Sequence, residues 1–184
     1  DALVAGLSLN IFNKHCDRVK MANIAQLINV LQAVILTDGP RMLRTPTYHV
    51  FHMYKYHQDA DLVESYLDGV ETIGEEKEYM VPSLQESVSV DKEGILTITL
   101  NNLSVDKNEP VEISFAECQT KEVTAAILNN EMHAYNTFED PDKVHEEVFS
   151  NYTVENGMIR FTMPASSVVQ FRVCLLYTSD AADE

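Results

Sequence analysis

From Ser83 onward, apolar and polar residues alternate along short runs that are separated by turn-forming residues. Side chains two positions apart lie on the same face of a strand, so each run predicts a strand with one apolar face. Turn signals at residues 91–94 and 155–157 divide the runs. Several short strands with this spacing are typical of an antiparallel β-sandwich. The apolar positions are Val88 and Val90; Leu96, Ile98 and Leu100; Val111, Ile113 and Phe115; Val123, Ala125 and Ile127; Ile159, Phe161 and Met163; and Val169, Phe171 and Val173.

The first sixty residues contain two segments with a helical pattern instead. Leu3, Leu7 and Ile11 recur every four positions, which predicts an amphipathic helix over residues 1–15. Thr45 and Pro46 place a hydroxyl N-cap before a proline at the first helical position, which predicts a second helix through Gln58.

Between these helices lies the longest nearly uncharged apolar stretch, residues 15–36, which reads HCDRVKMANIAQLINVLQAVIL. Its part from 19 to 27 predicts a strand buried on both faces and then a short helical turn, although periodicity alone leaves a core helix open. Helix, buried strand and helix form a fragment of alternating α/β architecture. Because a parallel strand needs neighbours for its hydrogen bonds, we expect the partner strands upstream of Asp1.

Four amides interrupt this apolar stretch: Asn23, Gln26, Asn29 and Gln32. A buried amide without partners costs roughly 1–3 kcal/mol, so the fold must satisfy these groups or some of them must face a ligand. The pattern alone leaves both alternatives open. A polar side chain at the carboxyl end of a parallel barrel strand points into the active-site mouth, and Gln26 is the amide nearest that end.

Composition narrows the classes of partner. The 184-residue chain has a net charge of −16 with only 13 scattered Lys and Arg, so a nucleic-acid surface is not expected. No apolar run reaches the roughly 18 residues of a membrane span. No signal peptide is visible, but the chain begins with Asp1 rather than Met and the N-terminus looks truncated. Three widely spaced cysteines argue against a disulfide framework and favour a reducing, cytoplasmic location.

The last eleven residues differ from the strand-like segment before them. We expect that strand to end at Val173. Residues 174–184, CLLYTSDAADE, resemble the translated read-through of a sequencing-library adapter. We therefore expect them to be non-native, the alternative being a genuine acidic tail.

Other candidate chemistry is weak. The adjacent acidic pairs Glu75/Glu76, Glu139/Asp140 and Glu146/Glu147 do not give the carboxylate separation of roughly 5–9 Å that a glycosidase needs. His49 and His52 have helical spacing, but no cysteine or carboxylate joins them at a fixed offset. His15 and Cys16 are sequence neighbours, which rarely have the geometry of a nucleophile pair. We expect neither a metal site nor a cofactor.

Three blocks of sequence resemble the C-terminal part of an α-L-arabinofuranosidase of glycoside hydrolase family 51. They are residues 1–39, DALVAGLSLNIFNKHCDRVKMANIAQLINVLQAVILTDG; residues 45–60, TPTYHVFHMYKYHQDA; and residues 136–144, NTFEDPDKV. The resemblance covers residues 1–173. It implies α/β plus all-β architecture, with the end of a TIM (β/α)8 barrel over residues 1–60 and an antiparallel β-sandwich of jelly-roll type over residues 61–173. Residues 19–26 would be the last barrel strand.

The resemblance also implies a function. Members are retaining hydrolases that remove terminal α-L-arabinofuranosyl groups from arabinoxylan, arabinan and arabino-oligosaccharides. Their two catalytic glutamates lie on earlier barrel strands, and neither motif occurs here, so no residue of this chain is assigned a catalytic role. The family's substrate-binding glutamine matches Gln26, with Asn29 as a supporting amide. The intact enzyme would bind an arabinose-containing glycan and form a homo-oligomer.

Two other functions remain open at this point. A non-catalytic carbohydrate-binding sandwich would present exposed aromatics on one face, but the chain has no Trp. Tyr79, Tyr135 and Tyr152 are not at alternating positions of one strand. An endo-acting glucanase of the same family would be distinguished by residues upstream of this chain.

Overall fold

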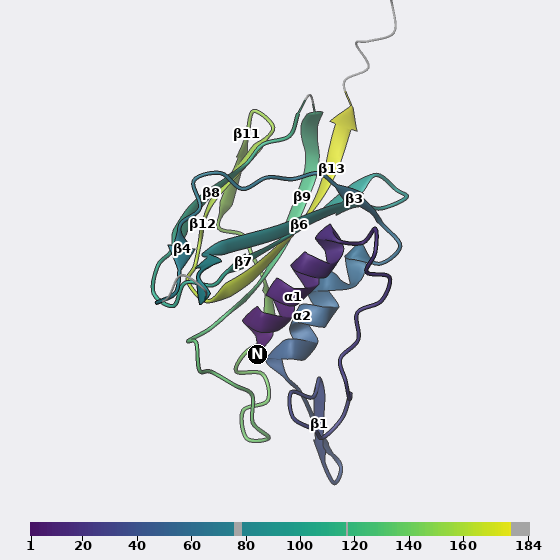
Figure 1. The fold of residues 1–184 in the computed structure, drawn as a ribbon, viewed down its shortest axis with the longest axis vertical. Coiled ribbons are helices and arrows are strands. Elements are labelled where there is room, and N and C mark those ends of the chain that lie inside the picture. Colours follow the sequence, from purple (N-terminus) through teal and green to yellow (C-terminus); the bar gives the residue numbers. More distant parts are fainter. Residues whose placement is uncertain (76–78, 117, 178–184) are drawn as a thin grey trace, which may run out of the picture.

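The structure is a computed structural model that describes residues 1–75, 79–116 and 118–177. A six-stranded sheet forms its middle layer, with a three-stranded sheet against one face and two helices against the other (Figure 1). The helical elements are α1 (Ala2–Lys14), α2 (Pro46–Tyr54) and the 3-10 turn η1 (Lys55–His57). The strands are β1 (Ile35–Asp38), β2 (Arg41–Arg44), β3 (Asp61–Val63), β4 (Thr72–Ile73), β5 (Val81–Pro82), β6 (Leu84–Val90), β7 (Ile95–Asn102), β8 (Glu109–Ile113), β9 (Cys118–Asn129), β10 (Glu146–Val148), β11 (Tyr152–Glu155), β12 (Met158–Met163) and β13 (Ser167–Tyr177).

All strand pairs in the two main sheets are antiparallel. The larger sheet has the order β10-β9-β13-β7-β6-β3, and the smaller has the order β11-β12-β8. The strands predicted from the alternating pattern are confirmed as β6, β7, β8, β9, β12 and β13. Asn156 and Gly157, in the turn between β11 and β12, have φ angles of 52° and 77°. A tight hairpin of this kind needs two residues with positive φ, and Asn-Gly provides them at low cost.

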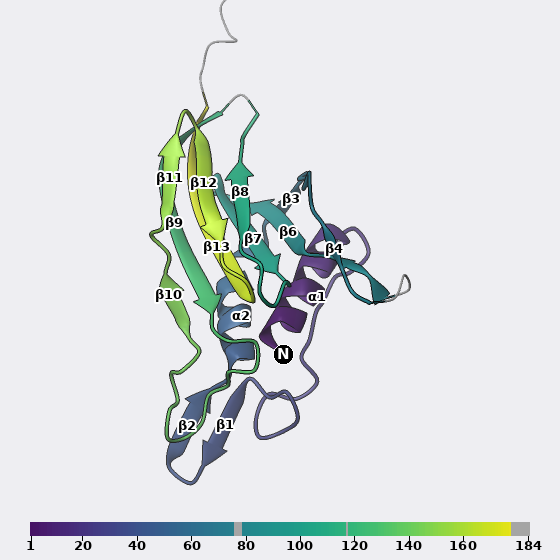
Figure 2. The same ribbon diagram turned by 90° about the vertical axis from the view of Figure 1, so that its left-hand side faces the viewer.

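The main apolar core lies between the two sheets. Its fully buried side chains include Ile159 and Met163 from the smaller sheet and Phe171 from the larger. The rings of Phe149 and Phe161 pack edge-on or tilted against that of Phe171, with centroids 6.3 Å and 5.0 Å away. The apolar face expected from the alternation is therefore the face that meets the opposing sheet. Figure 2 shows the strands of the smaller sheet, β8, β11 and β12.

The polar face of the large sheet is buried as well, because α1 and α2 cover it. Ser87, Thr99 and Asn101 on this face are fully buried. Asn10 of α1 is fully buried, and its Oδ1 lies 2.8 Å from both Ser87 Oγ and Thr99 Oγ1. Tyr54 of α2 donates from its hydroxyl to the same oxygen at 2.9 Å. The polar half of the alternating pattern therefore binds the helices rather than solvent.

Both predicted helices are confirmed, with small differences at their ends. Thr45 is the N-cap of α2 and Pro46 its first residue, as expected. The Thr45 hydroxyl does not cap the helix but donates to the carbonyl oxygen of Ala33 at 2.8 Å. The second helix also ends earlier than Gln58, because its last residues form the 3-10 turn η1. No helix in the described residues has the length and apolar character to span a membrane.

The prediction of a buried strand at residues 19–27 is wrong for this chain. The segment has no strand structure, and Met21 and Leu27 are largely exposed. A strand buried on both faces needs neighbouring strands for its hydrogen bonds, and none of the described strands pairs with this segment. Its apolar residues are left on the surface for the same reason.

The prediction that the last strand ends at Val173 is also wrong. β13 continues through Tyr177, and residues 174–177 pair with β9. The remaining residues of the segment expected to be non-native, 178–184, lie outside the described residues. The division into residues 1–60 and 61–173, the barrel assignment and the jelly-roll type stay predictions. The structure adds that α1 and α2 pack on the sheet across that boundary.

Close contact between α1 and the sheet predicts that Gly6→Ala lowers stability. In a helix interior, alanine is normally more stable than glycine by about 1 kcal/mol. Here a Cβ on Gly6 would overlap the Oδ1 of Asn101, a fully buried side chain whose Nδ2 donates to Tyr54. We expect a lower thermal midpoint by calorimetry, and part of the loss should be recovered in the double variant with Asn101→Ala. Ser8→Ala, in the same helix, is the control, and a raised midpoint for Gly6→Ala would contradict the packing.

Candidate functional site

Gln26 lies in an irregular segment between the end of α1 and the start of β1. Its side chain is exposed. The carbonyl oxygen of the next residue, Leu27, accepts hydrogen bonds from the backbone N–H groups of Val34 and Ile35, both at 3.1 Å. Ile28 forms an isolated parallel bridge with Ile35. The β1 side of the loop therefore fixes the backbone immediately after Gln26.

Asn29 closes this loop against β1. Its Oδ1 accepts from the backbone N–H of Thr37 at 2.7 Å, and its Nδ2 donates to the Thr37 hydroxyl at 2.8 Å. Its own N–H donates to the carbonyl oxygen of Ile35 at 3.2 Å. The φ of Asn29 is 54°, a conformation that asparagine tolerates better than most residues. The amide of Asn29 thus holds the loop, while the predicted substrate-binding roles of Gln26 and Asn29 stay predictions.

Sequence reasoning missed the partners that shape this loop. Thr37 binds both polar atoms of the Asn29 side chain, and the Thr45 hydroxyl donates to Ala33. Gln32 also has a positive φ of 60°. Two residues with positive φ within four positions, Asn29 and Gln32, indicate a compact loop rather than a strand. In the sequence, the asparagine at position 29 was the one local signal of such a loop.

A cavity of about 460 Å³ opens beside the loop. It lies between the N-termini of α1 and α2 and the residues that follow β9, with Val30 and Gln32 on the loop side and Leu128 and Val168 on the sheet side. Gln26 and Asn29 do not line it. The two predicted site residues are therefore close in the chain but are not brought together in this cavity.

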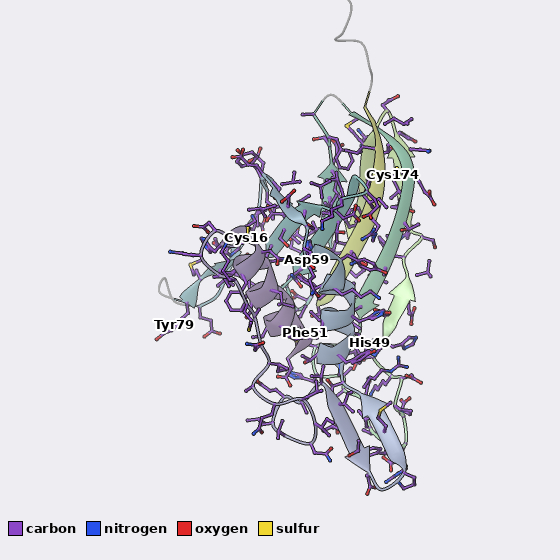
Figure 3. The ribbon with its side chains drawn as sticks, turned by 90° about the vertical axis from the view of Figure 1, so that its right-hand side faces the viewer. Cys16, His49, Phe51, Asp59, Tyr79 and Cys174 are labelled. Atoms are coloured by element: carbon purple, nitrogen blue, oxygen red, sulfur yellow. The ribbon has the colours of Figure 1, made fainter. Side chains whose placement is uncertain are left out.

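The histidines of α2 do not form a metal site. His49 is buried, and neither ring nitrogen has a hydrogen-bond partner among the described residues. Burial lowers the pKa of His49. His52 accepts from Lys55 Nζ at 2.8 Å, and its Nδ1 lies 2.7 Å from a carboxylate oxygen of Glu146 on β10. Figure 3 shows His49 on the side of α2 toward β10. Across the part of the chain that the structure describes, no group of three or more His, Cys, Asp or Glu could hold a metal ion.

The members of the acidic pairs that the structure describes lie on or near the surface, as interpreted from the sequence. Glu139 is exposed and lies 3.6 Å from Arg41, and Glu146 is paired with His52. Glu76 lies outside the described residues. None of these described carboxylates lines the cavity beside the loop. Cys16 is exposed at the end of α1 (Figure 3).

Comparison with known proteins connects this geometry to a family. The model of the α-L-arabinofuranosidase C-terminal domain matches residues 1–167, and thus the helices, the Gln26 loop and most of both sheets. The chain belongs to this family. The match runs without interruption across the boundary predicted at residue 60. In this arabinofuranosidase C-terminal domain, the helices and the sheet on which they pack are therefore matched together.

Curated relatives give the same family. The chain is 39% identical over 170 residues to an intracellular exo-α-L-arabinofuranosidase of Bacteroides ovatus, covering 92% of this chain and 33% of the relative. It is 26% identical over 172 residues to an exo-α-(1→6)-L-arabinofuranosidase of Bifidobacterium longum, covering 91% and 33%. The chain spans about a third of the length of these two relatives.

Solved structures match the fold. A family 51 arabinofuranosidase from Xanthomonas axonopodis pv. citri has a TM-score of 0.86 at 37% identity, covering 95% of this chain and 35% of that protein. An arabinose complex of the α-L-arabinofuranosidase from Thermotoga maritima has a TM-score of 0.82 at 24% identity, covering 96% and 38%. The second likeness shows the fold alone.

His57 is a titratable side chain whose pKa is shifted at the helix–sheet interface of this arabinofuranosidase domain. Its Nδ1 lies 2.8 Å from Ser89 Oγ, and its Nε2 lies 3.0 Å from Thr99 Oγ1. Burial, and secondarily the charge of Arg172, lowers the pKa of His57 to about 4. The folded protein therefore holds this imidazole neutral at pH values where an exposed histidine is protonated.

This predicts a loss of stability on acidification. The unfolded chain binds a proton at His57 near pH 6.5 and the folded chain near pH 4, so stability is full above pH 6.5 and falls as the pH drops toward 4. Between pH 7 and pH 5 the loss from this group should be roughly 2 kcal/mol. Urea unfolding at the two pH values measures it. His57→Gln should reduce the pH dependence, leaving a part from His49, and His133→Gln is the matched control. An unchanged pH dependence in His57→Gln would refute the assignment.

Proposed function

We propose that this chain is the C-terminal part of a retaining, exo-acting α-L-arabinofuranosidase whose catalytic glutamates lie outside the sequence. The observation that carries the proposal is the 39% identity to the B. ovatus enzyme over 92% of the chain but only 33% of that enzyme. The B. longum relative is also described as exo-acting. In the proposed enzyme, one upstream glutamate forms a covalent arabinosyl intermediate, while the other protonates the leaving oxygen and then activates water.

Within this enzyme, we assign Gln26 to the pocket for the terminal arabinose. Its side-chain amide is exposed and can both donate to and accept from sugar hydroxyls. Asn29 supports it by fixing the loop through Thr37. The chain thus contributes binding and orientation of the sugar, not proton transfer or nucleophilic attack.

Exposed apolar side chains support the proposal that another part of the intact enzyme packs against this chain. Leu31 is 94% exposed and Met21 is 76% exposed, both in the segment predicted to be the last barrel strand and its continuation. Val4 and Ile11 on α1 are also exposed. Apolar groups of this size on neighbouring segments are typical of a surface that another part of a protein covers. We propose that the catalytic barrel covers these residues.

The remaining features of the proposal follow from the relatives and the resemblance. Arabinoxylan, arabinan and arabino-oligosaccharides are the proposed substrates. A cytoplasmic location is supported by the relative described as intracellular. Homo-oligomerisation of the intact enzyme rests on the family resemblance. The net charge of −16 disfavours nucleic acid as a partner.

A non-catalytic carbohydrate-binding module is the weaker alternative. The small sheet borders a hollow of about 500 Å³ lined by Tyr152 and Arg160, among others. However, Tyr152 donates its hydroxyl to the carbonyl oxygen of Val123 at 2.9 Å, and Arg160 donates to Glu112 at 2.6 Å. Tyr79 projects from a separate edge of the molecule (Figure 3). No aromatic platform is assembled from these residues. An endo-glucanase of the same family is disfavoured by the exo-acting relatives.

The proposal predicts that the 184-residue chain alone does not hydrolyse 4-nitrophenyl α-L-arabinofuranoside, because it lacks both catalytic glutamates. A chimera that carries this chain in place of the matching third of the B. ovatus enzyme should release nitrophenol. Turnover by the isolated chain would contradict the proposal, as would a folded chimera that neither binds nor hydrolyses the substrate.

Within that chimera, Gln26→Ala should lower kcat/KM by roughly 5- to 150-fold, the range for losing one or two hydrogen bonds of about 1–3 kcal/mol in total. Asn23→Ala is the matched control, because Asn23 is an exposed amide of the same segment. Equal losses in the two variants would argue against a role for Gln26 in the sugar pocket.

A further inference from the structure

The loop of residues 136–144 has a rigid internal structure. Asn136, at its neck, is 6% exposed, and its Oδ1 accepts from the N–H of Val144 at 2.7 Å while its Nδ2 donates to the Val144 carbonyl oxygen at 2.9 Å. Across the loop, the N–H of Thr137 donates to the carbonyl oxygen of Asp140 at 3.1 Å, and the N–H of Asp140 donates to Thr137 Oγ1 at 3.0 Å. The side chain of Asn136 thus closes the loop at its base.

This loop binds the β1–β2 hairpin, which projects beyond the helices and lies beside the loop (Figure 2). Asn136 Nδ2 also donates to the carbonyl oxygen of Arg44 at 2.8 Å, a bond between residues 92 positions apart. The guanidinium of Arg41 lies 4.7 Å from the centroid of the Phe138 ring and 3.6 Å from Glu139. This ion pair and that of Arg44 with Asp142, 4.0 Å apart, are exposed and contribute little. The part-buried hydrogen bond from Asn136 is therefore the main polar attachment of the hairpin to the loop.

The hairpin in turn holds the Gln26 segment. Arg44 is paired with Ile35 in the β1–β2 register. The N–H of Ile35 donates to the carbonyl oxygen of Leu27, and the carbonyl oxygen of Ile35 accepts from the N–H of Asn29. The N–H of Thr45, the residue after Arg44, donates to the carbonyl oxygen of Val34 at 3.0 Å, and the N–H of Val34 donates to Leu27. Strand pairing and these backbone hydrogen bonds therefore connect Arg44, the residue that Asn136 binds, to the residue next to Gln26.

We infer that Asn136 is a positioning residue for the Gln26 segment. It acts through the β1–β2 hairpin and touches neither the segment nor a sugar. Asn136 and its loop, residues 136–144, belong to the predicted sandwich part of the chain. The sandwich part therefore orients Gln26, a binding residue of the predicted barrel part. The part of the inference that concerns how firmly Asn136 holds the hairpin rests on the fold alone. The effect on turnover rests on the function proposed above.

Amide hydrogen exchange on the 184-residue chain tests the structural half of this inference. Asn136→Ala should raise exchange in residues 27–44 about tenfold, the change expected for the loss of its one hydrogen bond to the hairpin, and should leave β7 and β13 protected. Asn130→Ala is the matched control, because Asn130 donates to the Lys143 carbonyl oxygen of the same loop without reaching the hairpin. Unchanged exchange in residues 27–44, or an equal rise throughout the sheet, would overturn the inference.

Kinetics of the chimera test the positioning half. Asn136→Ala should lower kcat/KM about tenfold when Gln26 is present, because a misplaced binding group loses its contact. In the Gln26→Ala background the same substitution should cost less than about threefold, since both changes remove one interaction. Additive losses would refute action through Gln26. An inactive chimera would count against the proposed function, while the exchange measurement would still decide whether Asn136 orders the hairpin.

Discussion

The contact between α1 and the large sheet includes a buried cluster of polar groups, and the position of the candidate site depends on it. Asn10 Oδ1 meets hydroxyls of Tyr54, Ser87 and Thr99 in a place that solvent does not reach. In a low-dielectric interior such bonds are strong and directional, and leaving them unmade is costly. They therefore fix how the helices lie on the sheet. Since the Gln26 segment begins at the end of α1 and leads through the hairpin to the start of α2, this contact fixes both ends of the loop.

This arrangement explains why a segment without regular structure still has defined geometry. Residues 27–35 are held by backbone bonds to β1 and by the Asn29–Thr37 pair. The hairpin is held in turn by Asn136. Gln26 itself precedes these attachments and is exposed. In the intact arabinofuranosidase proposed here, the barrel would cover the exposed apolar side chains of this segment.

The sequence predicted the strands well and the surroundings of their polar faces poorly. Alternation in β7 correctly identified Leu96, Ile98 and Leu100 as core residues, because side-chain alternation is a local property of a strand. Thr99 looks solvent-facing by the same pattern, but it is fully buried and its hydroxyl donates to Asn10 of α1. Such long-range packing leaves no periodic signal. The strand expected at residues 19–27 failed because pairing partners decide whether an apolar run becomes a strand. Gln26 and Asn29 were selected by resemblance, and only the structure revealed that Thr37 engages Asn29.

Because α1 and α2 pack directly on the large sheet, we expect the helices and the sheet to unfold as one cooperative unit, across the domain boundary predicted at residue 60. Hydrogen exchange measured along a urea gradient tests it most directly, by giving an unfolding midpoint for each element. We predict that α1, α2 and β7 lose protection at a single urea concentration. Loss of protection in α1 and α2 at clearly lower urea than in β7 would contradict the claim. It would show that the sheet is stable without the helices.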